Sequence, residues 1–140
     1  MIRLSRTAAI VLAVTLAPLA VHAAPAGQAG PDWIKNPVAV FTGLDKITGR
    51  SVDFDARIGQ TVKYGALRVT PRVCFTKPPT EQPRTDAFVQ IDEITLQGKT
   101  KRIFSGWMFA ASPGLNALEH PIYDVWLKAC KSSSQPANQG

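Results

Sequence analysis

Residues 104–130 read FSGWMFAASPGLNALEHPIYDVWLKAC and hold two tryptophans, a histidine and a cysteine. Ser112 followed by Pro113 is typical of a helix start, and Pro121 is expected to end that helix after two turns at most. Residues 123–130 then alternate between apolar and polar side chains, which predicts a final β-strand. The segment therefore predicts a strand, a short capped helix and a second strand that ends on the cysteine.

Earlier parts of the chain show the same alternation. Residues 51–58 (SVDFDARI) place apolar and charged side chains on opposite faces. Residues 67–75 (LRVTPRVCF) alternate as well, with four side chains expected to point inward: Leu67, Val69, Val73 and Phe75. Because Pro71 cannot donate to a ladder, this segment is predicted to be an edge strand or to break there. Further strands are expected at residues 38–41, 61–64, 87–98 and 101–112.

These elements predict a mainly β fold. Six or seven short strands, one short helix and one disulfide favour a compact antiparallel β-sandwich or barrel. The predicted organisation has four parts: a signal peptide at residues 1–23, a flexible segment at 24–35, a single β domain at 36–131 and a disordered tail at 132–140.

The first residues of the chain have the pattern of a secretory leader. Arg3 and Arg6 precede a mostly apolar run at residues 8–21, and small or aliphatic residues follow at the peptidase positions. The run is shorter than the roughly 20 residues that a bilayer core requires. We therefore predict a signal peptide cleaved after Ala23 and a periplasmic product that does not span the membrane.

Cys74 and Cys130 are the only cysteines of the chain. Export would carry them into an oxidising compartment, where an even number of cysteines predicts a disulfide. Cys74 shares the parity of Arg72, and Cys130 that of Trp126, so both are expected off the main apolar face, with the bond across a sheet or at its edge. Two thiols and one histidine are too few soft ligands for a closed zinc site, and we expect no metal and no cofactor.

Three successive motifs resemble one bacterial family. They are GLDKITGR (43–50), KYGALRVTPRVCFTKPPTEQPRTDAFVQIDE (63–93) and IFSGWMFAASPGLNALEHPIYDVWLKAC (103–130). In this order they are similar to the short exported proteins catalogued as domain of unknown function 2155, over about residues 38–130. The resemblance implies no activity, catalytic residue or cofactor. It does imply a cysteine pair that matches Cys74 and Cys130, which supports the disulfide.

One histidine outside the predicted leader, His120, is a candidate catalytic base. With Asp124, and with Ser105 or Ser112 as nucleophile, it would form the acid/base unit of a small hydrolase or transferase. The segment has no diagnostic spacing and no nucleophile elbow. A structural role for His120 at the end of the predicted helix is therefore favoured.

Aromatic and basic side chains are the candidates for binding. Trp107 and Trp126 are candidates for a surface that stacks on sugars or peptides, although core or rim positions are favoured for both. Arg68 and Arg72 share a non-core strand face, which makes them candidates for contact with an anionic envelope polymer such as peptidoglycan or lipopolysaccharide. The formal net charge is +6, but nucleic acid is not expected as a partner of an exported chain.

We therefore expect a binding or accessory module of the cell envelope with a protein or polymer partner, rather than an enzyme. Trp33 and the proline-rich loop at residues 76–85 are further interface candidates. The competing hypotheses are the hydrolase or transferase that uses His120 and Asp124, and the binder of an anionic envelope polymer.

Overall fold

The computed structural model describes residues 33–133, in which every regular element is a β-strand. Eight strands follow one another: β1 Ile34–Lys35, β2 Val38–Asp45, β3 Arg50–Arg57, β4 Val62–Tyr64, β5 Leu67–Thr76, β6 Thr85–Ile94, β7 Thr100–Phe109 and β8 Tyr123–Lys131. The alternation of apolar and polar residues predicted most of these strands, and the hairpin predicted around residues 98–100 joins β6 to β7.

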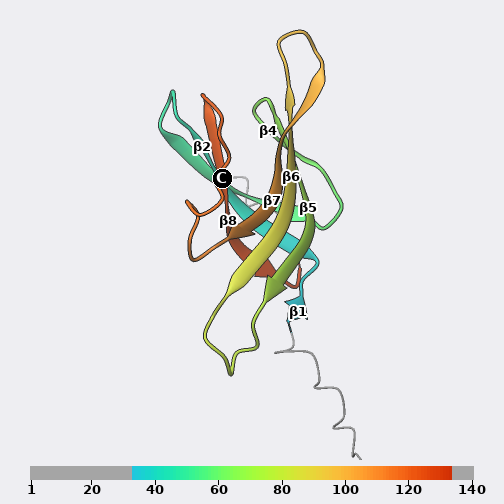
Figure 1. Ribbon diagram of the computed structural model, residues 1–140, viewed down its shortest axis with the longest axis vertical. Coiled ribbons are helices and arrows are strands. Elements are labelled where there is room, and N and C mark those ends of the chain that lie inside the picture. Colours follow the sequence, from blue (N-terminus) through green and yellow to red (C-terminus); the bar gives the residue numbers. More distant parts are fainter. Residues whose placement is uncertain (1–32, 134–140) are drawn as a thin grey trace, which may run out of the picture.

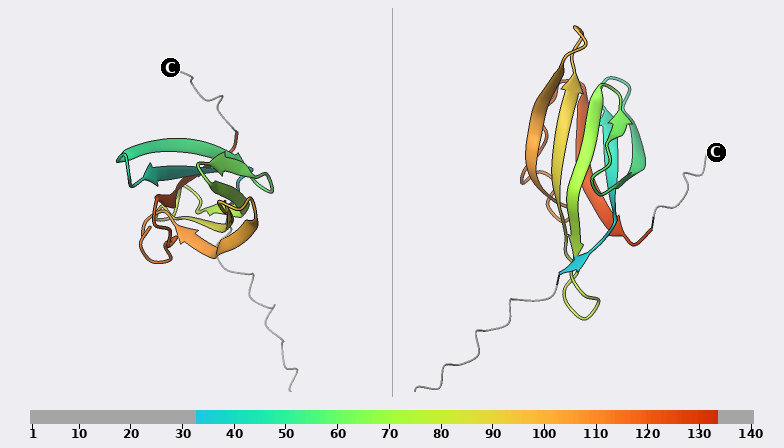
Figure 2. Two further views of the ribbon diagram at one scale, coloured as in Figure 1. Left: turned by 90° about the horizontal axis from the view of Figure 1, so that it is seen from above. Right: turned by 90° about the vertical axis from the view of Figure 1, so that its right-hand side faces the viewer.

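The strands form two antiparallel sheets that lie face to face (Figures 1 and 2). Sheet A has the order β1-β5-β6-β7, with β4 also paired to β5, and sheet B has the order β3-β2-β8. In the view from above in Figure 2, β2 and β3 lie in one layer and β6 and β7 in the other. The predicted mainly β antiparallel fold is confirmed, and its architecture is a sandwich.

The hydrophobic core lies between the two sheets. Sheet A contributes Val69 and Ile91, and sheet B contributes Phe41 and Leu127; all four side chains are almost completely buried. At roughly 25 cal/mol per Å² of apolar surface, the burial of such side chains is the main favourable term in folding. A domain of this size nevertheless buries only about two-thirds of its unfolded surface, so its stability margin is thin.

A β-bulge in β5 changes which of its side chains face the core. The register between β5 and β6 shifts between Pro71 and Val73, which leaves Arg72 as the extra residue. Beyond the bulge, Cys74 is buried in the core and Phe75 points to the outer face. The expectation that Val73 and Phe75 point inward was wrong, because one additional residue inverts the alternation.

Pro71 lies at the bulge, where its missing N–H does not remove a hydrogen bond to β6. Its carbonyl accepts a hydrogen bond from the Gly59 N–H at 2.8 Å, on the side of β5 away from β6. The nitrogen of an extended residue faces the same side as its carbonyl. The prediction of an edge strand or a break at Pro71 was wrong: β5 runs unbroken over Leu67–Thr76 and pairs on both sides, because the bulge accommodates the proline.

A second bulge has the same effect on β8. Its register with β2 shifts between Val40 and Phe41, so that Lys128 is the extra residue and lies opposite no residue of β2. Cys130 consequently pairs with Ala39, a core residue, and lies on the inner face. The expectation that both cysteines lie off the apolar face was wrong for this reason.

The disulfide between Cys74 and Cys130 joins the two sheets. Its Cα atoms are 5.8 Å apart and its ends are 56 residues apart in the chain. One cysteine belongs to β5 of sheet A and the other to β8 of sheet B. The predicted bond is confirmed, and it crosses the interior of the sandwich.

The segment between β7 and β8 is a loop and not the predicted helix. The Ser112 N–H donates to the Phe109 carbonyl and the Leu115 N–H to the Ser112 carbonyl, so each bond closes a single four-residue turn. The side-chain amide of Asn116 donates to the Trp107 carbonyl at 2.9 Å, and Leu118 is buried in the core. These tertiary contacts hold the loop against β7 and outweigh the local Ser-Pro helix signal.

Several expectations concern residues beyond the described range. The predicted signal peptide at residues 1–23 lies outside it, as do most of segment 24–35 and most of tail 132–140. Strand pairing begins at Ile34, which pairs with Thr76. Within residues 33–133 there is no helix that could cross a membrane.

Replacing both Cys74 and Cys130 by Ala is expected to lower the free energy of unfolding by about 4 kcal/mol, because the unfolded chain regains the entropy that the closed loop removes. Urea denaturation of the oxidised protein and of the double variant measures the difference. A loss below about 1 kcal/mol would mean that the sheets hold together without the bond.

Candidate binding face

The outer face of sheet A carries a cluster of aromatic side chains. Ala87 and Val89 of β6 point into the core, so the alternating residues Asp86 and Phe88 point outward. Their partners on the neighbouring strands also point outward: Asp86 pairs with Phe75 and Phe109, and Phe88 pairs with Trp107. We call the following set the aromatic face: Trp33, Phe75, Phe88, Trp107 and Phe109.

The rings of the aromatic face contact one another. Phe75 and Trp107 lie nearly parallel with centroids 6.1 Å apart, and Phe88 meets Trp107 edge-on at 5.6 Å. Trp33 is tilted against Phe75 at 6.2 Å. Trp33 and Trp107 nevertheless remain 37% and 38% exposed. The contacts therefore orient the rings but leave much of the indole surface in water.

Two cations of the loop between β5 and β6 lie over Trp33. The Lys77 Nζ is 4.4 Å from the ring centroid and the Arg84 Cζ is 5.4 Å from it, both within the range of a cation–π interaction. The Arg84 Nε also donates to the Asp86 Oδ2 at 3.0 Å. Asp86 is only 7% exposed, and Arg84 balances the charge of its carboxylate at the base of the aromatic face.

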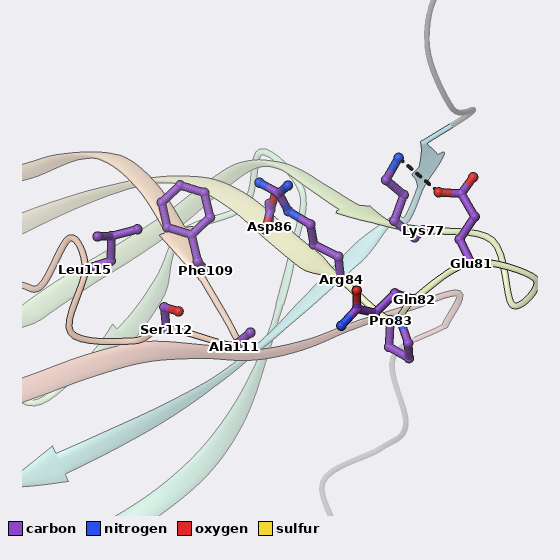
Figure 3. Close-up of a pocket in the computed structure, with 10 residues that line it drawn as sticks. All are labelled: Lys77, Glu81, Gln82, Pro83, Arg84, Asp86, Phe109, Ala111, Ser112 and Leu115. Atoms are coloured by element: carbon purple, nitrogen blue, oxygen red, sulfur yellow. Dashed lines mark hydrogen bonds and ion pairs between the residues drawn. The ribbon is translucent and has the colours of Figure 1, made fainter.

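Two adjoining hollows run along this face. The aromatic hollow, of 320 Å³, is lined by Trp33, Phe75, Arg84, Asp86, Trp107 and Phe109. The loop hollow, of 520 Å³, shares Arg84, Asp86 and Phe109 with it and continues past Ser112 to Leu115. In Figure 3, Arg84 reaches over the sheet to Asp86, beside the ring of Phe109. Because the hollows share three residues, they adjoin, and we call the two together the groove.

The other half of the same sheet face is rich in arginine. Arg102 donates to both carboxylate oxygens of Asp92, at 2.7 and 3.1 Å. On the neighbouring strand β5, Arg68 lies opposite Asp92 in the sheet register. Arg72 donates to the Gln90 Oε1 at 2.7 Å. The hydrogen bonds and charge of Arg102 hold the pKa of Asp92 below its ordinary value. The predicted pair Arg68 and Arg72 therefore lies on the same sheet as the aromatic face.

Trp126 lies elsewhere. It pairs with Thr42 and alternates with the buried Val125 and Leu127, so it faces outward from sheet B. There it lines a hollow of 330 Å³ under the loop between β7 and β8. Trp107 and Trp126, although both candidates for stacking, do not share one surface.

His120 is held inside the protein by both ring nitrogens. Its Nδ1 accepts the backbone N–H groups of Ile122 and Tyr123 at 3.1 and 3.0 Å, which leaves the proton of the neutral ring on Nε2. The Nε2 lies 3.2 Å from the Glu93 Oε1, and only 4% of the side chain is exposed. These contacts fix the start of β8 against β6.

The structure does not bring His120 and Asp124 together as an acid/base pair. Asp124 forms an ion pair with Lys46 at 3.1 Å. Ser105 is exposed on β7 as the partner of Gln90, and Ser112 lies in the wall of the loop hollow. Within residues 33–133 there is also no group of three or more His, Cys, Asp or Glu that could hold a metal ion.

Sequence reasoning did not single out Phe75, Phe88 and Phe109 as candidates for binding. A signal was present in β6 and β7, where Phe88 has the parity of the polar Gln90, and Trp107 and Phe109 have the parity of Ser105. Aromatic residues on the polar parity of two successive strands indicate an exposed aromatic surface. Phe75 gave no such signal because the bulge inverts its parity.

Comparison with known proteins identifies a family over most of the described chain. The model of a family described as "Uncharacterized protein conserved in bacteria (DUF2155)" matches residues 39–130. The chain belongs to this family. Both cysteines and every residue of the aromatic face except Trp33 lie within the match.

A curated relative adds no activity. An uncharacterized protein of Rickettsia prowazekii is 26% identical over 87 residues, which cover 62% of this chain and 56% of that protein. The match therefore spans about half of the relative's length. No solved structure matches the chain.

Replacing His120 by Ala is expected to lower the free energy of unfolding by about 2 kcal/mol, because two backbone N–H groups lose their acceptor. His120→Asn, which restores an acceptor near the position of Nδ1, should recover part of the loss. Thermal melts measure both, with Asp124→Asn as a control that costs at most about 1 kcal/mol. An unchanged melting temperature for His120→Ala, combined with lost complementation of a deletion strain, would favour a catalytic role.

The Asp92 and Arg102 pair is expected to make stability sensitive to acid. Because the pKa of Asp92 is lowered in the folded state, its contribution is present above the unfolded pKa and disappears as the pH falls through the folded pKa. The difference in melting temperature between the parent and Asp92→Asn should therefore shrink below about pH 4. A constant difference across that range, measured by thermal melts, would contradict this assignment.

Proposed function

We propose that this protein is exported and acts in the cell envelope as a binding module, with the outer face of sheet A as its binding surface. The basic and apolar leader at residues 1–23 supports export. The disulfide supports it too, because such bonds persist in oxidising compartments and are rare in the cytosol.

The aromatic face is the observation that carries the proposal. The outer face of an antiparallel sheet is usually polar where water covers it. Here five aromatic side chains gather on it, and both tryptophans stay more than a third exposed. Exposed apolar patches of this kind mark sites of interaction. Tryptophan and arginine are the side chains that most often dominate binding energy at protein interfaces.

The binding surface adjoins the features that sequence analysis singled out separately. Trp33, the proline-rich loop and Trp107 meet around the aromatic hollow, and the Arg68 and Arg72 half lies farther along the same strands. The groove is preformed by ring contacts and by the bond between Arg84 and Asp86, which lowers the entropy lost when a partner binds.

In-envelope cross-linking tests this function. A photo-reactive amino acid at Leu115, which is 71% exposed beside the groove, should cross-link the protein to a partner in its native bacterium. The Trp107→Ala variant should lose this adduct while remaining folded, whereas Trp126→Ala on sheet B should keep it. The recovered protein should begin at Ala24.

Two outcomes would contradict the proposal. An adduct that survives Trp107→Ala would place the binding surface elsewhere on the molecule. A recovered chain that retains residues 1–23 and fractionates with the cytosol would refute export.

A further inference from the structure

We infer that the groove binds an extended acidic segment of a partner protein, with a large apolar side chain in the aromatic hollow and a carboxylate on Arg84. This inference rests on the proposed function and specifies the chemistry of its partner. It is carried by the composition of the groove, by the unused donors of Arg84 and by the charge of the surrounding face.

The aromatic hollow fits an apolar side chain better than a sugar. Four of its six lining residues are aromatic. Its two polar residues, Arg84 and Asp86, bond to each other through the Arg84 Nε, so the terminal nitrogens of Arg84 are the donors that this pair leaves free. Sugar hydroxyls need several free donors and acceptors in a site, because a hydroxyl that is buried without a hydrogen bond weakens binding. A leucine, phenylalanine or tryptophan side chain needs only the rings.

Arg84 has donors left for an acidic group. Its Nε bonds to Asp86, but among the described residues no acceptor takes the N–H groups of its two terminal nitrogens. The side chain is 55% exposed, at the junction of the two hollows. A guanidinium with free terminal nitrogens is suited to bidentate bonds with a carboxylate. A carboxylate bound there would lie beside the apolar side chain in the aromatic hollow.

The rest of the face favours an anionic partner over a second copy of this chain. Each described acid along the face has a basic partner: Glu81 with Lys77, Asp86 with Arg84 and Asp92 with Arg102. Arg68 and Arg72 bond only to neutral groups, so the face keeps a positive excess. Two copies meeting through this face would bring like charges together, whereas an acidic segment would complement them.

The groove also has the form that an extended segment requires. It continues from the aromatic hollow to the loop hollow, whose far end carries the exposed Leu115. Side chains of an extended peptide alternate, so those on one side can occupy successive hollows. Pro83 and Leu115 line the loop hollow and provide contacts for a second apolar side chain.

Selection from a phage-displayed library of random linear peptides on the oxidised protein, without residues 1–23, tests the inference. Enriched peptides should combine an aromatic or large aliphatic residue with nearby Asp or Glu, and their affinity should fall as salt rises. Trp107→Ala should weaken binding by at least about tenfold. Arg84→Glu should abolish the enrichment of acidic peptides. Arg50→Glu, the same charge reversal on sheet B, should leave the selected sequences unchanged.

The outcomes separate the inference from the proposed function. Enriched peptides without acidic residues, or peptides that bind Trp107→Ala as well as the parent, would overturn the inference. Co-sedimentation with peptidoglycan that Trp107→Ala abolishes, together with no peptide enrichment, would overturn it as well and identify a glycan partner on the proposed surface. If Trp107→Ala also leaves the envelope cross-link intact, the proposed function fails with it.

Discussion

The disulfide between the two sheets is the constraint on which the rest of the structure depends. Its expected contribution of about 4 kcal/mol is comparable with the whole stability of a small domain. It forms only because a bulge in β5 and another in β8 turn Cys74 and Cys130 toward the core. Adjacent residues of a strand face opposite ways, so the bulge that buries Cys74 also moves Phe75 to the outer face. The bulge in β5 thus serves two features: together with the bulge in β8 it allows the disulfide, and it adds Phe75 to the aromatic face.

A second set of aromatic rings lies against the core and packs against His120. Phe41, Phe54, Tyr64 and Tyr123 contact one another in sequence, with centroids 5.4 to 5.7 Å apart, and the imidazole of His120 stacks on Tyr123 at 5.4 Å. Gly43 belongs to this arrangement, since a Cβ there would lie 2.5 Å from the Tyr64 ring. The inner rings contribute to the stability of the sandwich. The outer rings of sheet A are separate from them and form the surface that we propose for binding.

The sequence was informative wherever alternation ran without interruption. It predicted the strands, the antiparallel class and the orientations of Val125 and Leu127, because a period of two requires only local residues. The disulfide followed from the cysteine count and the expected export instead. It failed beyond the bulges in β5 and β8. One extra residue reverses the direction of each side chain that follows in the strand, and the local sequence does not show where the extra residue is inserted. Pro71 predicted an edge strand or a break, and the structure instead has a bulge that changes the direction of Phe75. The helix prediction failed because Leu118 and Asn116 make tertiary contacts that the Ser-Pro signal does not contain.

The two halves of the outer face of sheet A follow different rules, although the same three strands build both. Around Asp92 and Gln90 the face is charged and polar, as a face in water normally is. Around Asp86 and Phe88 it is aromatic. The fold does not require this difference, because the core between the sheets is filled without these rings. Exposed tryptophan also adds a risk of aggregation that polar residues at the same positions would avoid. The proposed partner, by covering the aromatic half, would account for both the composition of that half and its position beside a positive surface.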